Sequence, residues 1–110
     1  MNRHTLRKSQ RGSKRLMHLM KRAQREMAPH MEKFTSPSNE IAFVQLSGIA
    51  AIVAAGQESE EYLKAATKQV SESTGIPLSA VMAHAECNRA MMTEMQSRFT
   101  PPIVGGRKNA

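Results

Sequence analysis

A chain of 110 residues allows one small domain with a modest hydrophobic core, which excludes a multidomain architecture. It has no Trp, one Tyr and three Phe, so aliphatic residues and nine Met must provide the packing, a composition that favours helices. The net charge of +7 is unevenly distributed: residues 1–33 hold ten Lys or Arg and two Glu (+8), whereas the remainder holds six Lys or Arg and seven Glu (−1). This asymmetry favours an anionic partner.

Residues 1–13, MNRHTLRKSQRGS, are predicted to be a basic disordered arm, because Leu6 is the only bulky apolar residue after Met1. Ser13 is expected to cap a following helix. The arm resembles a mitochondrial transit peptide in its lack of acids, but it has no long apolar run of the kind found in a secretory signal. Its candidate nucleic-acid contacts are Arg3, Arg7, Lys8 and Arg11.

Residues 14–34 are predicted to form a basic amphipathic helix. At about 100° per residue, six cationic side chains fall within an arc of roughly 120°, opposite an apolar arc. The cationic set is Lys14, Arg15, His18, Lys21, Arg22 and Arg25. The apolar set is Leu16, Leu19, Met20, Ala23, Met27, Met31 and Phe34. Like charges spaced by four residues repel in an isolated helix, and a polyanion would remove that repulsion. A solvated face over a core-facing stripe stays open as the alternative.

Two signals divide this helix from the rest of the chain. Pro29 removes a backbone donor, so the helix is expected to kink or end near Ala28. The segment TSPSN at 35–39 then marks the boundary of a helical body that covers residues 35–100. In this segment Ser36 and Pro37 have the residue types expected at a helix N-cap and first position.

The run from Ile41 to Gly56 is apolar nearly all round, which predicts a buried, central helix. Its 16 residues fall short of the roughly 20 that cross a bilayer, so membrane insertion is a weaker reading. A short strand over Ile41 to Leu46 also stays open.

The final part of the body is predicted to contain two helices. One begins at Glu60 and stops at Gly75, and the second has Pro77 in its first turn and ends before Pro101. Seven residues of the second recur at three- and four-residue steps, a heptad-like seam that predicts a homodimer interface. They are Leu78, Val81, Ala85, Asn88, Met92, Met95 and Phe99. Residues 101–110 are expected to be a flexible tail.

The stretch 70–84 has a small Ser71, Gly75 at the turn and an apolar Val81, and in these features it resembles the turn of helix-turn-helix DNA-binding proteins. The resemblance implies that the second helix reads DNA. Thr74 departs from the usual apolar residue, and the second helix lacks the Arg, Asn and Gln that contact base edges at its start. A plain helical hairpin explains the same residues.

His84 and Cys87 lie three residues apart, as a nucleophile and base or half a metal site would. A structural zinc site needs four ligands, and a catalytic thiolate needs a nearby positive group and an orienting third residue. We therefore predict no catalytic residue, metal or cofactor. The single cysteine cannot form an internal disulfide, which favours a reducing cytoplasm.

Together these patterns predict an all-α protein of about four helices that binds nucleic acid through phosphate contacts from the arm and first helix, as a non-enzymatic accessory or regulatory protein. DNA ranks slightly ahead of RNA. The aromatic residues fall on apolar stripes, so base stacking is not expected and backbone and groove contacts remain. Two alternatives remain: an adaptor whose first helix docks in a protein partner's groove, and a membrane-surface protein.

Overall fold

The computed structural model describes the backbone of residues 3–99 and the side chains of residues 14–97. The helices are α1 (Arg3–Met27), α2 (Met31–Phe34), α3 (Glu40–Ala54), α4 (Glu60–Thr74) and α5 (Leu78–Phe99). Short 3₁₀ turns at Ala28–His30 and Pro37–Asn39 flank α2. The predicted all-α class is confirmed for the described part of the chain. The alternative of a strand at 41–46 is wrong, because these residues lie inside α3.

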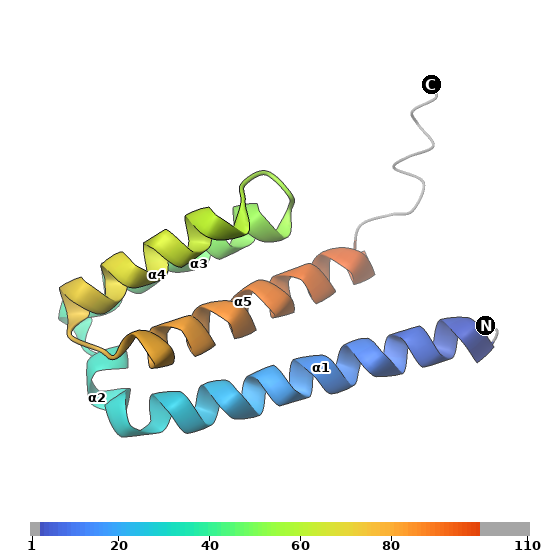
Figure 1. Ribbon diagram of the computed structural model, residues 1–110, viewed down its shortest axis with the longest axis horizontal. Helices are drawn as coiled ribbons and strands as arrows, with labels where there is room; N and C mark the ends of the chain where they lie inside the picture. The colour runs from blue at the N-terminus through green and yellow to red at the C-terminus, as the bar shows by residue number, and fades with distance from the viewer. Residues whose placement is uncertain (1–2, 100–110) are drawn as a thin grey trace.

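The α5 helix occupies the centre of the molecule, with α1 on one side and the antiparallel α3–α4 pair on the other (Figure 1). It packs against all three of these helices. The predicted central helix, 41–56, is instead peripheral: Leu46, Ala50 and Val53 are buried, but Ile41 is 72% and Val44 65% exposed. Among the described helices, α4 and α5 are the ones that pack extensively on α3, and they leave its outer face uncovered.

The hydrophobic core belongs to α3, α4, α5 and the turn that joins the last two. Its buried members are Leu46, Ala50, Val53, Leu63, Val70, Ile76, Ala80, Val81 and Ala85. Among the described side chains of α1, only Ala23 is fully buried. The α1 helix therefore lies on the surface of a body that has a core of its own.

The predicted disordered arm is helical from Arg3 onward, and Ser13 lies within α1 rather than at its start. This part of the prediction is wrong because residues 3–13 contain no Pro, and the cost of their single Gly, about 1 kcal/mol relative to Ala, does not stop a helix. The expected break is confirmed: α1 ends at Met27 and Pro29 lies in the 3₁₀ turn that follows.

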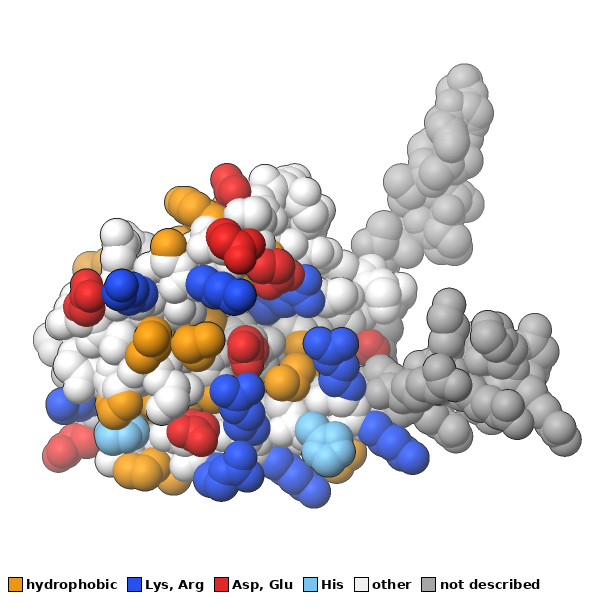
Figure 2. Space-filling view, in the orientation of Figure 1, with side chains coloured by type: hydrophobic (Ala, Val, Ile, Leu, Met, Phe, Trp, Pro, Cys, Tyr) orange, Lys and Arg blue, Asp and Glu red, His pale blue; other side chains and the backbone are white. Residues whose placement is uncertain are grey.

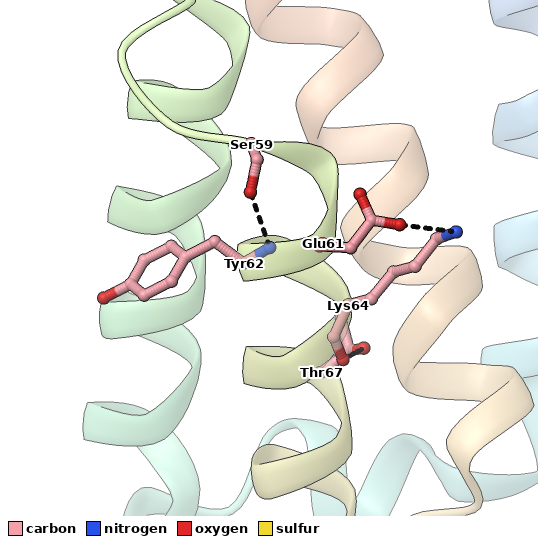
Figure 3. Close-up of polar contacts among 5 residues, drawn as sticks. All are labelled: Ser59, Glu61, Tyr62, Lys64 and Thr67. Atoms are coloured by element: carbon pink, nitrogen blue, oxygen red, sulfur yellow. Dashed lines mark hydrogen bonds and ion pairs between the residues drawn. The ribbon is translucent and has the colours of Figure 1, made fainter.

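Side chains fix the start of α4. The Ser59 hydroxyl accepts a hydrogen bond from the Tyr62 backbone N–H at 3.2 Å, which satisfies a first-turn donor (Figure 3). One turn later Lys64 lies 3.9 Å from Glu61, and the hydroxyl of buried Thr67 donates to the Lys64 carbonyl at 2.6 Å. These contacts join residues three positions apart at the start of α4.

The turn between α4 and α5 is closed by hydrogen bonds. Gly75 has the left-handed conformation predicted for a helix stop, with φ of 76°. The Ser71 hydroxyl donates to the Ile76 carbonyl at 2.6 Å, and Lys33 Nζ donates to the Gly75 carbonyl at 3.2 Å. The last bond ties the segment after α1 to this turn.

The predicted dimer seam of α5 packs inside the monomer. Val81 and Ala85 are buried in the core, and Met92 packs against it. The Asn88 amide donates to Ser47 Oγ of α3 at 2.9 Å. Val81 and Ala85 are therefore not available for the predicted dimer contact, because α3 and α4 of the same chain already pack on them. Asn88 and Met92 are half-buried. Leu78 and Met95 remain exposed, and the Phe99 side chain lies outside the described residues.

Candidate nucleic-acid interface

Four cationic or titratable side chains form a stripe on α1: Lys14, His18, Lys21 and Arg25, here called the outer stripe. All four are exposed. They follow one another at steps of four, three and four residues, so they lie within about 60° of each other around the helix. No ion pair in the described part of the chain involves Lys14, Lys21 or Arg25. Their charge is therefore available to an external anion.

The helical backbone extends the same spacing toward the start of α1. Arg3, Arg7 and Arg11 are at positions that continue the outer stripe, whereas Lys8 is at a position about 110° around the helix from its centre. Their side chains lie outside the described residues. At 1.5 Å per residue, the positions from Arg3 to Arg25 cover roughly 33 Å of helix. No acidic residue precedes Glu26, so the whole length has one sign of charge.

Arg22 was predicted to contact nucleic acid and instead connects α1 to α5. Its Nη1 donates to Glu86 Oε1 at 2.8 Å, and both side chains are a little over 40% exposed. Arg15 is exposed beside this pair, at a 310 Å³ pocket that it shares with Glu60 and Arg89. Because Glu60 pairs with Arg89 and Glu86 with Arg22, Arg15 keeps an uncompensated charge at the flank of the outer stripe.

The opposite, apolar side of α1 is used within the chain. Leu16, Leu19 and Met27 are half-buried around Ala23, on the side that packs against α5. This packing covers the centre of the face that an adaptor or membrane-surface protein would present to its partner and leaves Met20 40% exposed. Figure 2 shows Lys and Arg side chains along the lower edge of the molecule, where α1 runs.

His84 and Cys87 share a helix but have different neighbours. The centroid of the His84 ring lies 5.6 Å from that of Phe34 and 5.4 Å from that of Phe43. Burial lowers the pKa of the His84 imidazole. Burial raises the pKa of the Cys87 thiol, whose nearest polar contact is Met91 Sδ at 3.9 Å. A thiol with a raised pKa is a poor nucleophile. Among the described residues, no three His, Cys, Asp or Glu side chains are placed to hold a metal ion.

The helix-turn-helix resemblance implies a second helix free to enter a groove, and α5 is not free. It is covered by α1 along one side and by α3 and α4 along others. Its exposed start offers Leu78 and Ser79, which carry no charge for phosphates. The hairpin interpretation therefore accounts for residues 70–84.

Sequence reasoning found the outer stripe from its periodicity and missed Glu86 as the partner of Arg22. These two residues are 64 positions apart, and no local pattern signals such a pair. Searches against family models, curated proteins and solved structures found no match to this chain. One helical segment, Pro37–Ala54, has the length and hydropathy of a weak membrane-span candidate, and only 17% of it is buried.

Proposed function

We propose that this protein is a non-catalytic nucleic-acid-binding protein in which the outer stripe of α1 contacts the phosphates of a duplex. We propose that it prefers duplex DNA to duplex RNA. The observation that carries the proposal is the row of exposed cations on one face of α1, Lys14, Lys21 and Arg25, none of which forms an ion pair with the side chains that the structure describes. Phosphate neutralisation supplies most of the affinity of non-specific nucleic-acid binding.

The stripe has a cost in the isolated protein that a polyanion removes. Lys21 and Arg25 are four residues apart, and such like-charge pairs destabilise a helix by about 0.2–0.5 kcal/mol each. A surface that serves solubility alone tolerates both signs of charge. The absence of any acid from residues 1–25 therefore supports an anionic polymer as the ligand.

The surroundings of the stripe favour a duplex over a single strand. Proteins that bind single strands stack bases on exposed aromatic rings. Phe34 and Phe43 pack against each other with ring centroids 5.0 Å apart. Tyr62 is exposed but belongs to α4, across α5 from α1. The outer stripe carries no Phe, Tyr or Trp, and its one ring is the His18 imidazole. A helix whose exposed side is mostly Lys and Arg suits backbone contacts along a groove, and the major groove of B-DNA, about 12 Å wide, admits a helix.

Fluorescence anisotropy over a series of salt concentrations tests the proposal, with duplex DNA, duplex RNA and single-stranded DNA of equal length. Each phosphate contact on duplex DNA contributes about −0.9 to the slope of log K against log salt. The double variant Lys14→Ala/Lys21→Ala should make the slope less negative by about 1.8.

The matched control is Lys64→Ala/Lys68→Ala, which removes the same charge from α4. It should leave the slope within error of the wild-type value, because α4 lies on the other side of α5. Equal losses in both double variants would show that net charge alone attracts the duplex and would refute the stripe as the binding face. Tighter binding to single strands than to duplexes would refute the duplex preference.

A further inference from the structure

An apolar strip runs along the outer face of α3. Ile41, Val44 and Ile52 are 72%, 65% and 37% exposed, and Gly48 lies between them. At about 100° per residue these four positions fall within roughly 80° of one another, so they form one face. We call them the α3 outer face. Exposed apolar residues that are contiguous, rather than scattered, mark interaction sites.

Gly48 lies near the middle of this face and has open space above it. A Cβ placed there would meet no atom within 4 Å, so no contact inside the chain requires a glycine. Glycine is also a poor helix former. A helix surface with a glycine at its centre and branched apolar residues on both sides allows another helix to approach closely.

The charges around the α3 outer face argue against a nucleic acid or an anionic membrane surface as its partner. Residues 40–54 contain one charged residue, Glu40, and the next one along the chain is Glu58, after the end of the helix. The negative charge of Glu40 and Glu58 and the apolar composition of the face do not attract phosphates. The Lys and Arg that usually flank a membrane-surface helix are missing from α3. An uncharged apolar surface is best covered by another one.

We propose that the occupant of the α3 outer face is the same face of a second copy of this chain. Two copies of a +7 protein repel each other, and the excess charge is concentrated on α1. Because α1 lies across α5 from the α3–α4 pair, association through α3 keeps the two basic helices apart (Figure 1). A two-fold axis beside Gly48 would pair each apolar residue with its equivalents, as an isologous interface requires.

The size of the face sets the strength of the dimer. A helix of 15 residues is about 22 Å long, so two of them bury less than the roughly 1,200 Å² typical of stable complexes. A weak, concentration-dependent dimer is expected in the absence of a ligand. On a duplex, two α1 helices held by one dimer would bind together with a high effective concentration, a step that rests on the proposed function.

Sedimentation equilibrium without nucleic acid tests the dimer independently of that function. Wild-type protein should show a monomer–dimer equilibrium at micromolar concentrations, and Val44→Asp should raise the dissociation constant at least tenfold. Met95→Asp is the matched control, because Met95 is 54% exposed on α5, at the end of the seam first predicted to dimerise. It should dimerise as the wild type does. Circular dichroism would verify that both variants are folded.

Cross-linking locates the interface. In a Cys87→Ala background, Gly48→Cys should form a disulfide-linked dimer on mild oxidation, since a bridge requires Cα atoms within about 7 Å. Ser97→Cys, on the exposed side of α5, should cross-link far less. Equal cross-linking of the two variants, or a wild-type protein that stays monomeric up to high micromolar concentration, would overturn the proposal. So would flotation with anionic vesicles that Val44→Asp abolishes, since the occupant would then be a membrane.

Discussion

Lys21 and Arg22 are adjacent on α1, carry the same charge and have different surroundings. Lys21 points outward without an acidic partner in the described part of the chain, whereas Arg22 pairs with Glu86 at 2.8 Å. Lys21→Ala should make the salt slope of duplex binding less negative by about 0.9 and raise the unfolding midpoint slightly, because it removes the repulsion between Lys21 and Arg25. Arg22→Ala should leave the slope nearly unchanged and lower stability by less than about 1 kcal/mol, as for other exposed ion pairs.

Salt-dependent anisotropy and urea melts of the two variants check this pair of outcomes. The prediction revises the sequence-based assignment of Arg22 to a phosphate contact. If Arg22→Ala changed the slope as much as Lys21→Ala does, the Arg22–Glu86 pair would have to open on binding.

Gly75 offers a test of backbone conformation at a single residue. Its φ of 76° places it in the left-handed region, where a Cβ costs roughly 1–2 kcal/mol. Gly75→Ala should therefore lower the free energy of unfolding by about that amount. Gly48→Ala is the opposite case, since Gly48 lies in a regular helix with open space around it, and it should raise stability by up to about 1 kcal/mol. Urea denaturation of both variants and the wild type, analysed with one shared m-value, measures these changes in the free energy of unfolding.

Half-buried His84 gives the protein a pH dependence of defined sign. Burial lowers the pKa of His84 in the folded state below its ordinary value of 6.5, so the unfolded chain takes up the proton first. The stability contributed by neutral His84 is complete above pH 6.5 and is lost as pH falls below that value. Urea midpoints between pH 7.5 and pH 5 should decline in the wild type and decline less in His84→Gln.

The control for this titration is His18→Gln, which changes an exposed histidine of the outer stripe. Its midpoints should decline with pH as those of the wild type do. An identical decline in His84→Gln would mean that other groups cause the pH dependence.

At the scale of whole helices, the structure separates α1 from the body. The core residues come from α3, α4, α5 and the turn before α5, and none of the described side chains of α1, residues 14–27, is among them. A fragment of residues 36–100 should therefore fold alone and show a cooperative helical melt by circular dichroism. Its midpoint should be lower than that of the full chain, because removing α1 uncovers Cys87 on α5, which lies beside Ala23 and Met27. A fragment that melts without cooperativity would show that α5 needs α1 to fold.

At the scale of the whole molecule, the uneven charge predicts which half of the chain controls binding. Removing residues 1–13 deletes Arg3, Arg7, Lys8 and Arg11 and reduces the net charge from +7 to +3. If all four contact phosphates, the slope of log K against log salt should become less negative by up to about 3.6. The thermal midpoint should change little, since the core lies in residues 46–85. An unchanged slope would confine the interface to Lys14, Lys21 and Arg25.

The sequence by itself determined the all-α class, the break at Pro29, the stop at Gly75 and the separation of charge along α1. Each depends on residues within a few positions of one another: a proline without its N–H, a glycine that accepts a left-handed backbone, a spacing that repeats every turn. Such local signals act before the chain has a tertiary structure, and they can be found without one.

Only the tertiary structure decided which helix is central, which cations are paired and which apolar face stays uncovered. Asn88 and Ser47 are 41 positions apart and Arg22 and Glu86 are 64 apart, so their pairing depends on how the helices pack. A heptad-like seam has the same periodicity whether its partner helix belongs to the same chain or to another copy. The α5 seam was therefore assigned to a dimer, although α3 and α4 cover it, and the exposed face of α3 was expected to be buried. Periodicity fixes which residues share a face, and packing fixes what that face meets.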